Sequence, residues 1–159
     1  METIAEARLY LRENLNVGAT CPCCKQYVKL YKRKITGVTA AGLVILYRRN
    51  MRIGWNDYVC IPDLLTEKKY TDVTKLFYWD LIEPLIGKRE EGSKRVGYWR
   101  LTQKGREFVE GKIAIDKNVF VYNNKVYRRS EEKATIKDCL GLKFDYEELM
   151  SDVKEPELF

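Results

Sequence analysis

Three cysteines lie within four residues near the N-terminus, in the segment Cys21-Pro22-Cys23-Cys24. The spacing of Cys21 and Cys24 is typical of half a zinc site, because two thiolates on one tight loop can bind the same ion. A structural zinc ion takes four ligands, and the chain has no second CxxC pair and no histidine. Cys23, Cys60 or Cys139 would have to complete the set. Three interpretations stay open: a structural zinc site at Cys21 and Cys24, small buried thiols beside a turn, or a redox pair.

The absence of histidine narrows the catalytic chemistry that this chain can carry. Without an imidazole there is no Ser-His or Cys-His nucleophile pair, and acid–base catalysis would need a tuned Asp, Glu, Lys or Tyr. The sequence also lacks the GxxxxGK[ST] and GxGxxG loops that cradle phosphates. We therefore expect a protein that binds a partner and is not an enzyme.

Basic residues are concentrated in one part of the chain, although the net charge of the 159 residues is only +6. Residues 14–56 contain eight lysines and arginines and no acidic residue, whereas the chain beyond Ser130 is mainly acidic. A one-sided positive potential attracts nucleic acid, acidic protein or anionic lipid. The alternative is a solvated basic face that only keeps the protein in solution. The acidic end could fold over the basic stretch or dock on a basic protein.

Composition indicates an ordinary globular chain, with 45% hydrophobic and 33% charged residues. No apolar run reaches the 18 residues that a membrane-spanning helix needs. The first residues are acidic and polar, unlike a signal peptide. We expect a cytoplasmic protein with no membrane partner, whose cysteines are thiols or metal ligands.

Apolar spacing and capping residues predict a series of short elements. We expect a helix over 3–15 capped by Thr3, and a second helix over about 38–50 capped by Thr36 or Thr39. A strand over 58–61, a brief helix from Pro62 and a longer helix from Thr71 to before Pro84 follow. After a basic loop over 87–97 come a strand over 98–101 and a capped helix over 102–109.

The last third of the chain has a different pattern. Two apolar segments, 119–122 and 125–128, flank Asn123-Asn124, which predicts a β-hairpin because asparagine tolerates a positive φ. A short helix is expected near 136–140, followed by an acidic tail. The predicted organisation is a helix with a basic cysteine arm over 1–36, a core over 37–111, and a hairpin with an acidic tail over 112–159, packed on the core.

Two segments of the core carry a resemblance to a known fold. The segment Leu76-Phe77-Tyr78-Trp79-Asp80-Leu81-Ile82-Glu83 resembles the end of a winged-helix recognition helix. The segment Gly97-Tyr98-Trp99-Arg100-Leu101-Thr102-Gln103-Lys104-Gly105 resembles the strand that returns from the wing in regulators of the MarR and PadR type. Asp80 stands where such regulators usually have glycine. The sequence is also similar in character to small bacteriophage-encoded proteins, for which the compartment would be the host cytosol.

This resemblance implies an α+β fold with a winged helix-turn-helix core and a partner that is duplex DNA, in transcriptional or replication control. The alternative is a non-enzymatic inhibitor that docks on a protein, such as an anti-host or anti-defence factor of a phage or mobile element. The helix over 3–15 could support a homodimer.

The candidate DNA contacts fall into three groups. The free face of the recognition helix is expected to supply Thr71, Thr74, Lys75 and Tyr78. The wing is expected to supply Lys88, Arg89, Lys94 and Arg95, and the basic arm is expected to supply Lys32, Arg33 and Lys34. The first group would meet base edges and the other two would bind phosphates.

Overall fold

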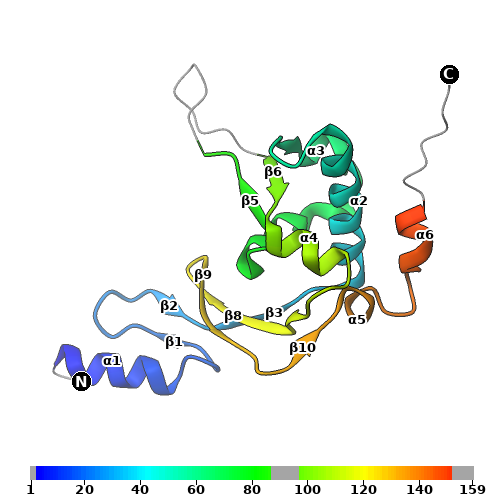
Figure 1. The fold of residues 1–159 in the computed structure, drawn as a ribbon. Coiled ribbons are helices and arrows are strands. Elements are labelled where there is room, and N and C mark those ends of the chain that lie inside the picture. The colour runs from blue at the N-terminus through cyan, green and yellow to red at the C-terminus, as the bar shows by residue number, and fades with distance from the viewer. Residues whose placement is uncertain (1–2, 87–96, 152–159) are drawn as a thin grey trace, which may run out of the picture. The chain divides into compact units, whose positions relative to one another are not determined.

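Helices and small antiparallel sheets alternate along the chain, which is a mixed α+β protein (Figure 1). The structure, a computed structural model, describes residues 3–86 and 97–151. The chain divides into two units, Met1–Lys34 with Lys117–Glu131 (unit 1) and Ile35–Asp116 with Glu132–Phe159 (unit 2). No helix in the described ranges is long and apolar enough to cross a membrane.

Unit 1 begins with helix α1, Ile4–Glu13. The Thr3 hydroxyl accepts a hydrogen bond from the amide of Glu6 at 3.1 Å, so the predicted cap is confirmed. Strands β1, Ala19–Thr20, and β2, Tyr27–Val28, then pair antiparallel and enclose the cysteine segment in a short loop. The cysteine arm is thus a β-hairpin.

The main sheet of unit 1 has the order β3-β8-β9 (Figure 1). Its strands are β3, Tyr31–Lys34, β8, Asn118–Tyr122, and β9, Lys125–Arg129. Asn123 and Asn124 join β8 to β9 with φ of 50° and 62°, which confirms the predicted hairpin. Because β8 also pairs with β3, the hairpin belongs to unit 1 together with the N-terminal segment. Such a long-range pairing leaves no trace in the local sequence pattern.

Unit 2 is built around helix α2, Gly37–Ile53, whose cap is Thr36: its hydroxyl accepts a hydrogen bond from the amide of Thr39 at 3.2 Å. Helix α2 contacts a 3₁₀-helix, η1, Lys68–Trp79, as well as the later helices of the unit. At Gly42 the approach is close, because a Cβ there would lie 2.5 Å from Cγ2 of Val73. The absence of a side chain at Gly42 therefore lets η1 pack directly on α2.

The sheet of unit 2 that follows α2 has the order β4-β6-β5. Its strands are β4, Val59–Cys60, β5, Ile82–Pro84, and β6, Tyr98–Leu101. Helix α3, Ile61–Leu64, separates β4 from η1, and helix α4, Gln103–Val109, follows β6 with the predicted cap at Thr102. The other elements expected between 37 and 111 are present in the expected order, but the helix expected from Thr71 to before Pro84 is different. It is η1, which ends at Trp79, and Ile82–Pro84 forms strand β5 instead.

Asn50 ties this sheet to the end of α2. Its side chain is fully buried, its amide group donates to the carbonyls of Gly54 and Asp57 at 2.6 and 3.1 Å, and its oxygen accepts from the amide of Leu101 at 2.9 Å. Each polar atom of this buried side chain is thus paired, as burial requires.

The C-terminal part of unit 2 adds a further strand pair and two helices. Strand β7, Ile115–Asp116, pairs with β10, Lys133–Ala134. Helix α5, Ile136–Leu140, has a capping box between Thr135 and Asp138, and helix α6, Tyr146–Ser151, ends the described chain. The short helix predicted near 136–140 is therefore confirmed.

Candidate nucleic-acid interface

The expected recognition helix is η1, and its 3₁₀ geometry decides which residues it buries. A 3₁₀-helix has three residues per turn, so positions three apart lie on one face. Val73, Leu76 and Trp79 follow this spacing and are all buried. Trp79 is anchored further by its indole nitrogen, which donates to the carbonyl of Asp116 at 2.7 Å. One face of η1 is thus held firmly in unit 2.

The other sides of η1 differ in part from the expected ones. Thr71 is exposed, and Thr74 and Lys75 are half-buried, so these three candidates remain accessible. The expectation that Tyr78 lies on the free face is wrong: this residue is only 4% exposed, whereas its neighbour Phe77 is 36% exposed. An α-helical period of 3.6 places Tyr78 with Thr74 and Lys75, but a period of three places Phe77 with Thr71 and Thr74.

The start of η1 also differs from the prediction. The helix begins at Lys68 with no side-chain cap, and the Thr71 hydroxyl donates to the Lys68 carbonyl instead of capping. Lys68 and Lys69 are exposed in this first turn. They are cations that the sequence-based assignment of the helix start left out.

The turn from η1 into β5 is made at Asp80. Its φ of 60° and ψ of 27° are left-handed, the conformation that glycine adopts most readily. The Asp80 amide donates to the carbonyl of Phe77 at 3.0 Å, and the Thr102 hydroxyl donates to the Asp80 carbonyl. Aspartate therefore makes a left-handed turn directly after η1.

Strands β5 and β6 lead to and from the expected wing. Glu83 pairs with Arg100 in the register, and their side chains form a 2.7 Å ion pair. Arg100 also donates to the carbonyl of Asn56 and lies 4.6 Å from the Tyr58 ring centroid, so its contacts are structural. The wing candidates, Lys88, Arg89, Lys94 and Arg95, lie outside the described residues.

Lys32, Arg33 and Lys34 form most of strand β3 and are all exposed. In the register, Lys32 lies opposite Phe120, and Phe120 lies opposite Arg128 on the other side. Directly paired residues share a face of a sheet, and the Arg128 guanidinium lies 4.3 Å from the Phe120 ring centroid. A cation from each outer strand thus flanks one aromatic ring. The sequence pattern missed this partnership because it depends on the pairing of β3 with β8.

The cysteine loop between β1 and β2 is closed by backbone hydrogen bonds. The amide of Cys21 donates to the carbonyl of Gln26 at 2.7 Å, and the amide of Lys25 donates to the carbonyl of Cys21 at 2.9 Å. Cys21 is buried, whereas Cys23 and Cys24 are exposed. Hydrogen bonds from the backbone amides of Cys24 and Cys23 lower the pKa of the Cys21 thiol, because they stabilise its thiolate.

The two remaining cysteines have different surroundings. Cys60 and Cys139 are half-buried and belong to unit 2, and burial raises the pKa of the Cys139 thiol to about 11. Among the residues that the structure describes, no three Cys, Asp or Glu side chains are grouped so that they could hold a metal ion. The structure therefore brings Cys21 and Cys24 together but gives them no further ligand from the described parts of the same chain.

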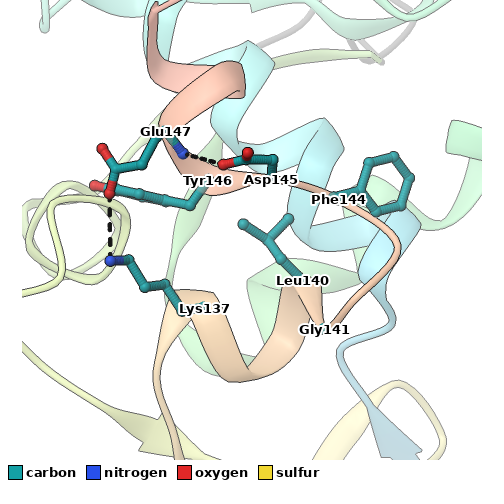
Figure 2. A pocket seen from close by; sticks show the side chains of 7 residues that line it. All are labelled: Lys137, Leu140, Gly141, Phe144, Asp145, Tyr146 and Glu147. Carbon is teal, nitrogen blue, oxygen red and sulfur yellow. Dashed lines mark hydrogen bonds and ion pairs between the residues drawn. The ribbon is translucent and has the colours of Figure 1, made fainter.

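A hollow of about 230 Å³ lies between α5 and α6. Across it, the Lys137 ammonium and the Glu147 carboxylate form an ion pair at 3.3 Å, and Asp145 accepts a hydrogen bond from the amide of Glu147 (Figure 2). The Tyr146 hydroxyl donates to the carbonyl of Val109 at 2.7 Å. These polar groups bind one another, so we assign the hollow to the anchoring of α6 rather than to a ligand.

Comparison with protein-family models, with curated proteins and with solved structures finds no significant match for this chain.

Proposed function

We propose that unit 2 is a winged-helix domain that binds duplex DNA, in transcriptional or replication control. The observation that carries this proposal is the order α2–β4–α3–η1–β5–β6–α4 together with the sheet order β4-β6-β5. This is the chain order of a winged helix-turn-helix, with the loop between β5 and β6 as the wing. Because a fold alone does not define a function, the surface of η1 and the charges around it supply the rest of the argument.

In this proposal η1 enters the major groove, which is about 12 Å wide in B-DNA. Thr71 and Thr74 offer hydroxyls and Lys75 an ammonium to base edges, while Phe77 offers an apolar contact to a thymine methyl group. The buried Val73, Leu76 and Trp79 hold η1 in place from the opposite side. The base-reading set is therefore Thr71, Thr74, Lys75 and Phe77, without Tyr78.

Phosphate contacts come from cations that flank η1 in the sequence and from unit 1. Lys68 and Lys69 are exposed in the first turn of η1, and Lys88, Arg89, Lys94 and Arg95 would bind the backbone from the wing. Lys32, Arg33 and Lys34 of β3, with Arg128 of β9, give unit 1 cations on both outer strands of its sheet, suited to a second stretch of phosphates.

Selection of bound sequences from a random duplex pool tests the role of η1. The full chain should enrich a defined site, and Thr74→Ala and Lys75→Ala should each weaken binding to that site by about 1–3 kcal/mol and relax the preference at one position. Lys143→Ala removes one exposed positive charge near the C-terminus and serves as the control, with selection unchanged. If the full chain binds no duplex at low salt, the protein-docking function is favoured instead.

A further inference from the structure

The loop between β1 and β2 holds its thiols in a defined arrangement. Antiparallel pairing of Ala19 with Val28 and of Thr20 with Tyr27 fixes both ends of the loop. Lys25, directly after the last cysteine, has a left-handed φ of 65°, which turns the chain back towards β2. Cys21 and Cys24 are therefore brought together by the backbone and do not depend on a ligand for their proximity.

Two backbone hydrogen bonds close the loop that carries the sulfurs. The amide of Cys21 donates to the carbonyl of Gln26 at 2.7 Å, and the amide of Lys25 donates to the carbonyl of Cys21 at 2.9 Å. A tight loop of this kind can direct two thiolates at the same ion. Cys24 is exposed, so a metal ion bound here would face solvent and a second molecule could approach it.

The same loop supplies only two of the four ligands that a tetrahedral metal site requires. Zn²⁺ in structural sites takes four N or S ligands, the chain has no histidine, and no third suitable side chain is grouped with the pair among the described residues. We propose that Cys21 and Cys24 form half of a zinc–thiolate site that is completed by the same two cysteines of a second copy of this chain.

Binding requires deprotonation of each ligand, so four thiols release four protons to water as one Zn²⁺ ion joins two chains. Four thiolates around one divalent ion leave a net charge of two minus. Lys25 is exposed in each loop and supplies one positive charge per copy beside the site. The proposal is independent of DNA binding, since Cys21 and Cys24 are not among the proposed DNA contacts and its readouts need no nucleic acid.

Titration of the reduced, metal-free full chain with Co²⁺ tests the site, because tetrahedral cobalt thiolates absorb strongly in the visible and near-ultraviolet. We expect saturation at one Co²⁺ per two chains, together with a doubling of the molar mass by light scattering that a chelator reverses. Saturation at one ion per chain with unchanged mass would overturn the proposal. So would the absence of a thiolate absorption band, which would identify the cysteines as structural thiols.

Single serine substitutions identify the ligands. Cys21→Ser and Cys24→Ser should each abolish the cobalt spectrum and the change in mass, whereas Cys23→Ser and Cys139→Ser should keep both. Cys24 is exposed, so Cys24→Ser tests the site even if substitution of the buried Cys21 disturbs the fold. Retention of the spectrum in Cys24→Ser, or its loss in Cys23→Ser, would contradict the proposed ligand set.

Discussion

The carbonyl oxygen of Leu81 lies where a side chain at Gly105 would have to begin. A Cβ atom added at Gly105 would lie 2.0 Å from this oxygen, which also accepts a hydrogen bond from the amide of Thr102 at 3.1 Å. The first turn of α4 therefore rests directly on the backbone turn at the end of η1. This contact gives a physical reason for the spacing of Leu101-Thr102 and Gly105, the pattern on which the resemblance to winged-helix regulators depends.

Gly105→Ala should lower the free energy of unfolding by about 1–3 kcal/mol, the usual cost of forcing an extra carbon into a packed site. The higher helix propensity of alanine offsets part of this cost. Chemical denaturation measures the difference, with Gln103→Ala in the exposed first turn of α4 as the control that stays close to wild type. A Gly105→Ala variant as stable as wild type would contradict the close contact with Leu81.

The left-handed backbone of Asp80 should make two substitutions at this position differ in their effect on the free energy of unfolding. Asp80→Gly should be neutral or stabilising by up to about 1 kcal/mol, since glycine adopts this conformation without a steric penalty. Asp80→Val should lower the free energy of unfolding by about 1–2 kcal/mol, because a β-branched side chain is strained there. Equal stability of the glycine and valine variants would show that the turn does not have this geometry.

Tyr47 predicts a loss of stability at high pH. Burial, and then the hydrogen bond from its hydroxyl to Glu110 at 2.9 Å, raise the pKa of Tyr47 to about 12. An unfolded tyrosine titrates near pH ~10, so the unfolded chain loses this proton first. The contribution of protonated Tyr47 to the free energy of unfolding is therefore fully present below pH ~10, and it is lost as the pH rises through about 12.

Denaturation of wild type and of Tyr47→Phe from neutral pH to about pH 12 checks this linkage. At neutral pH the Tyr47→Phe variant should be about 1 kcal/mol less stable, because it lacks the hydrogen bond. Phenylalanine cannot titrate, so the free energy of unfolding of the variant should fall less steeply above pH ~10 than that of wild type. Parallel curves across the whole range would show that Tyr47 does not keep its proton longer in the folded state.

Local chemistry explains which elements the sequence could predict. Thr3, Thr36 and Thr102 cap the helices that follow them, and a threonine before an apolar helical stripe is visible in the sequence itself. The Asn123-Asn124 turn is equally local, since two asparagines can adopt a positive φ in sequence. Features of this kind need no knowledge of distant partners.

The errors arise where distant packing decides. Over residues 73–79, the apolar spacing fits both an α-helix and a 3₁₀-helix. The structure has the 3₁₀-helix, which packs against α2 at Gly42, and in it Tyr78 is buried and Phe77 is exposed. The pairing of β3 with β8 likewise joins residues far apart in the chain. For this reason Lys32, Arg33 and Lys34 could be proposed from charge alone, whereas Arg128 could not.

The salt dependence of binding to random-sequence duplex DNA tests the central claim most directly. We would compare wild type with Lys94→Ala plus Arg95→Ala, and with Lys112→Ala plus Lys143→Ala as a control that removes the same charge outside the proposed interface. If Lys94 and Arg95 bind phosphates, the slope of log K against log salt should fall in magnitude by about 1.8 for the wing variant and stay unchanged for the control. Equal slopes for wild type and the wing variant, or no binding of the full chain at low salt, would contradict a winged helix that grips DNA through its wing.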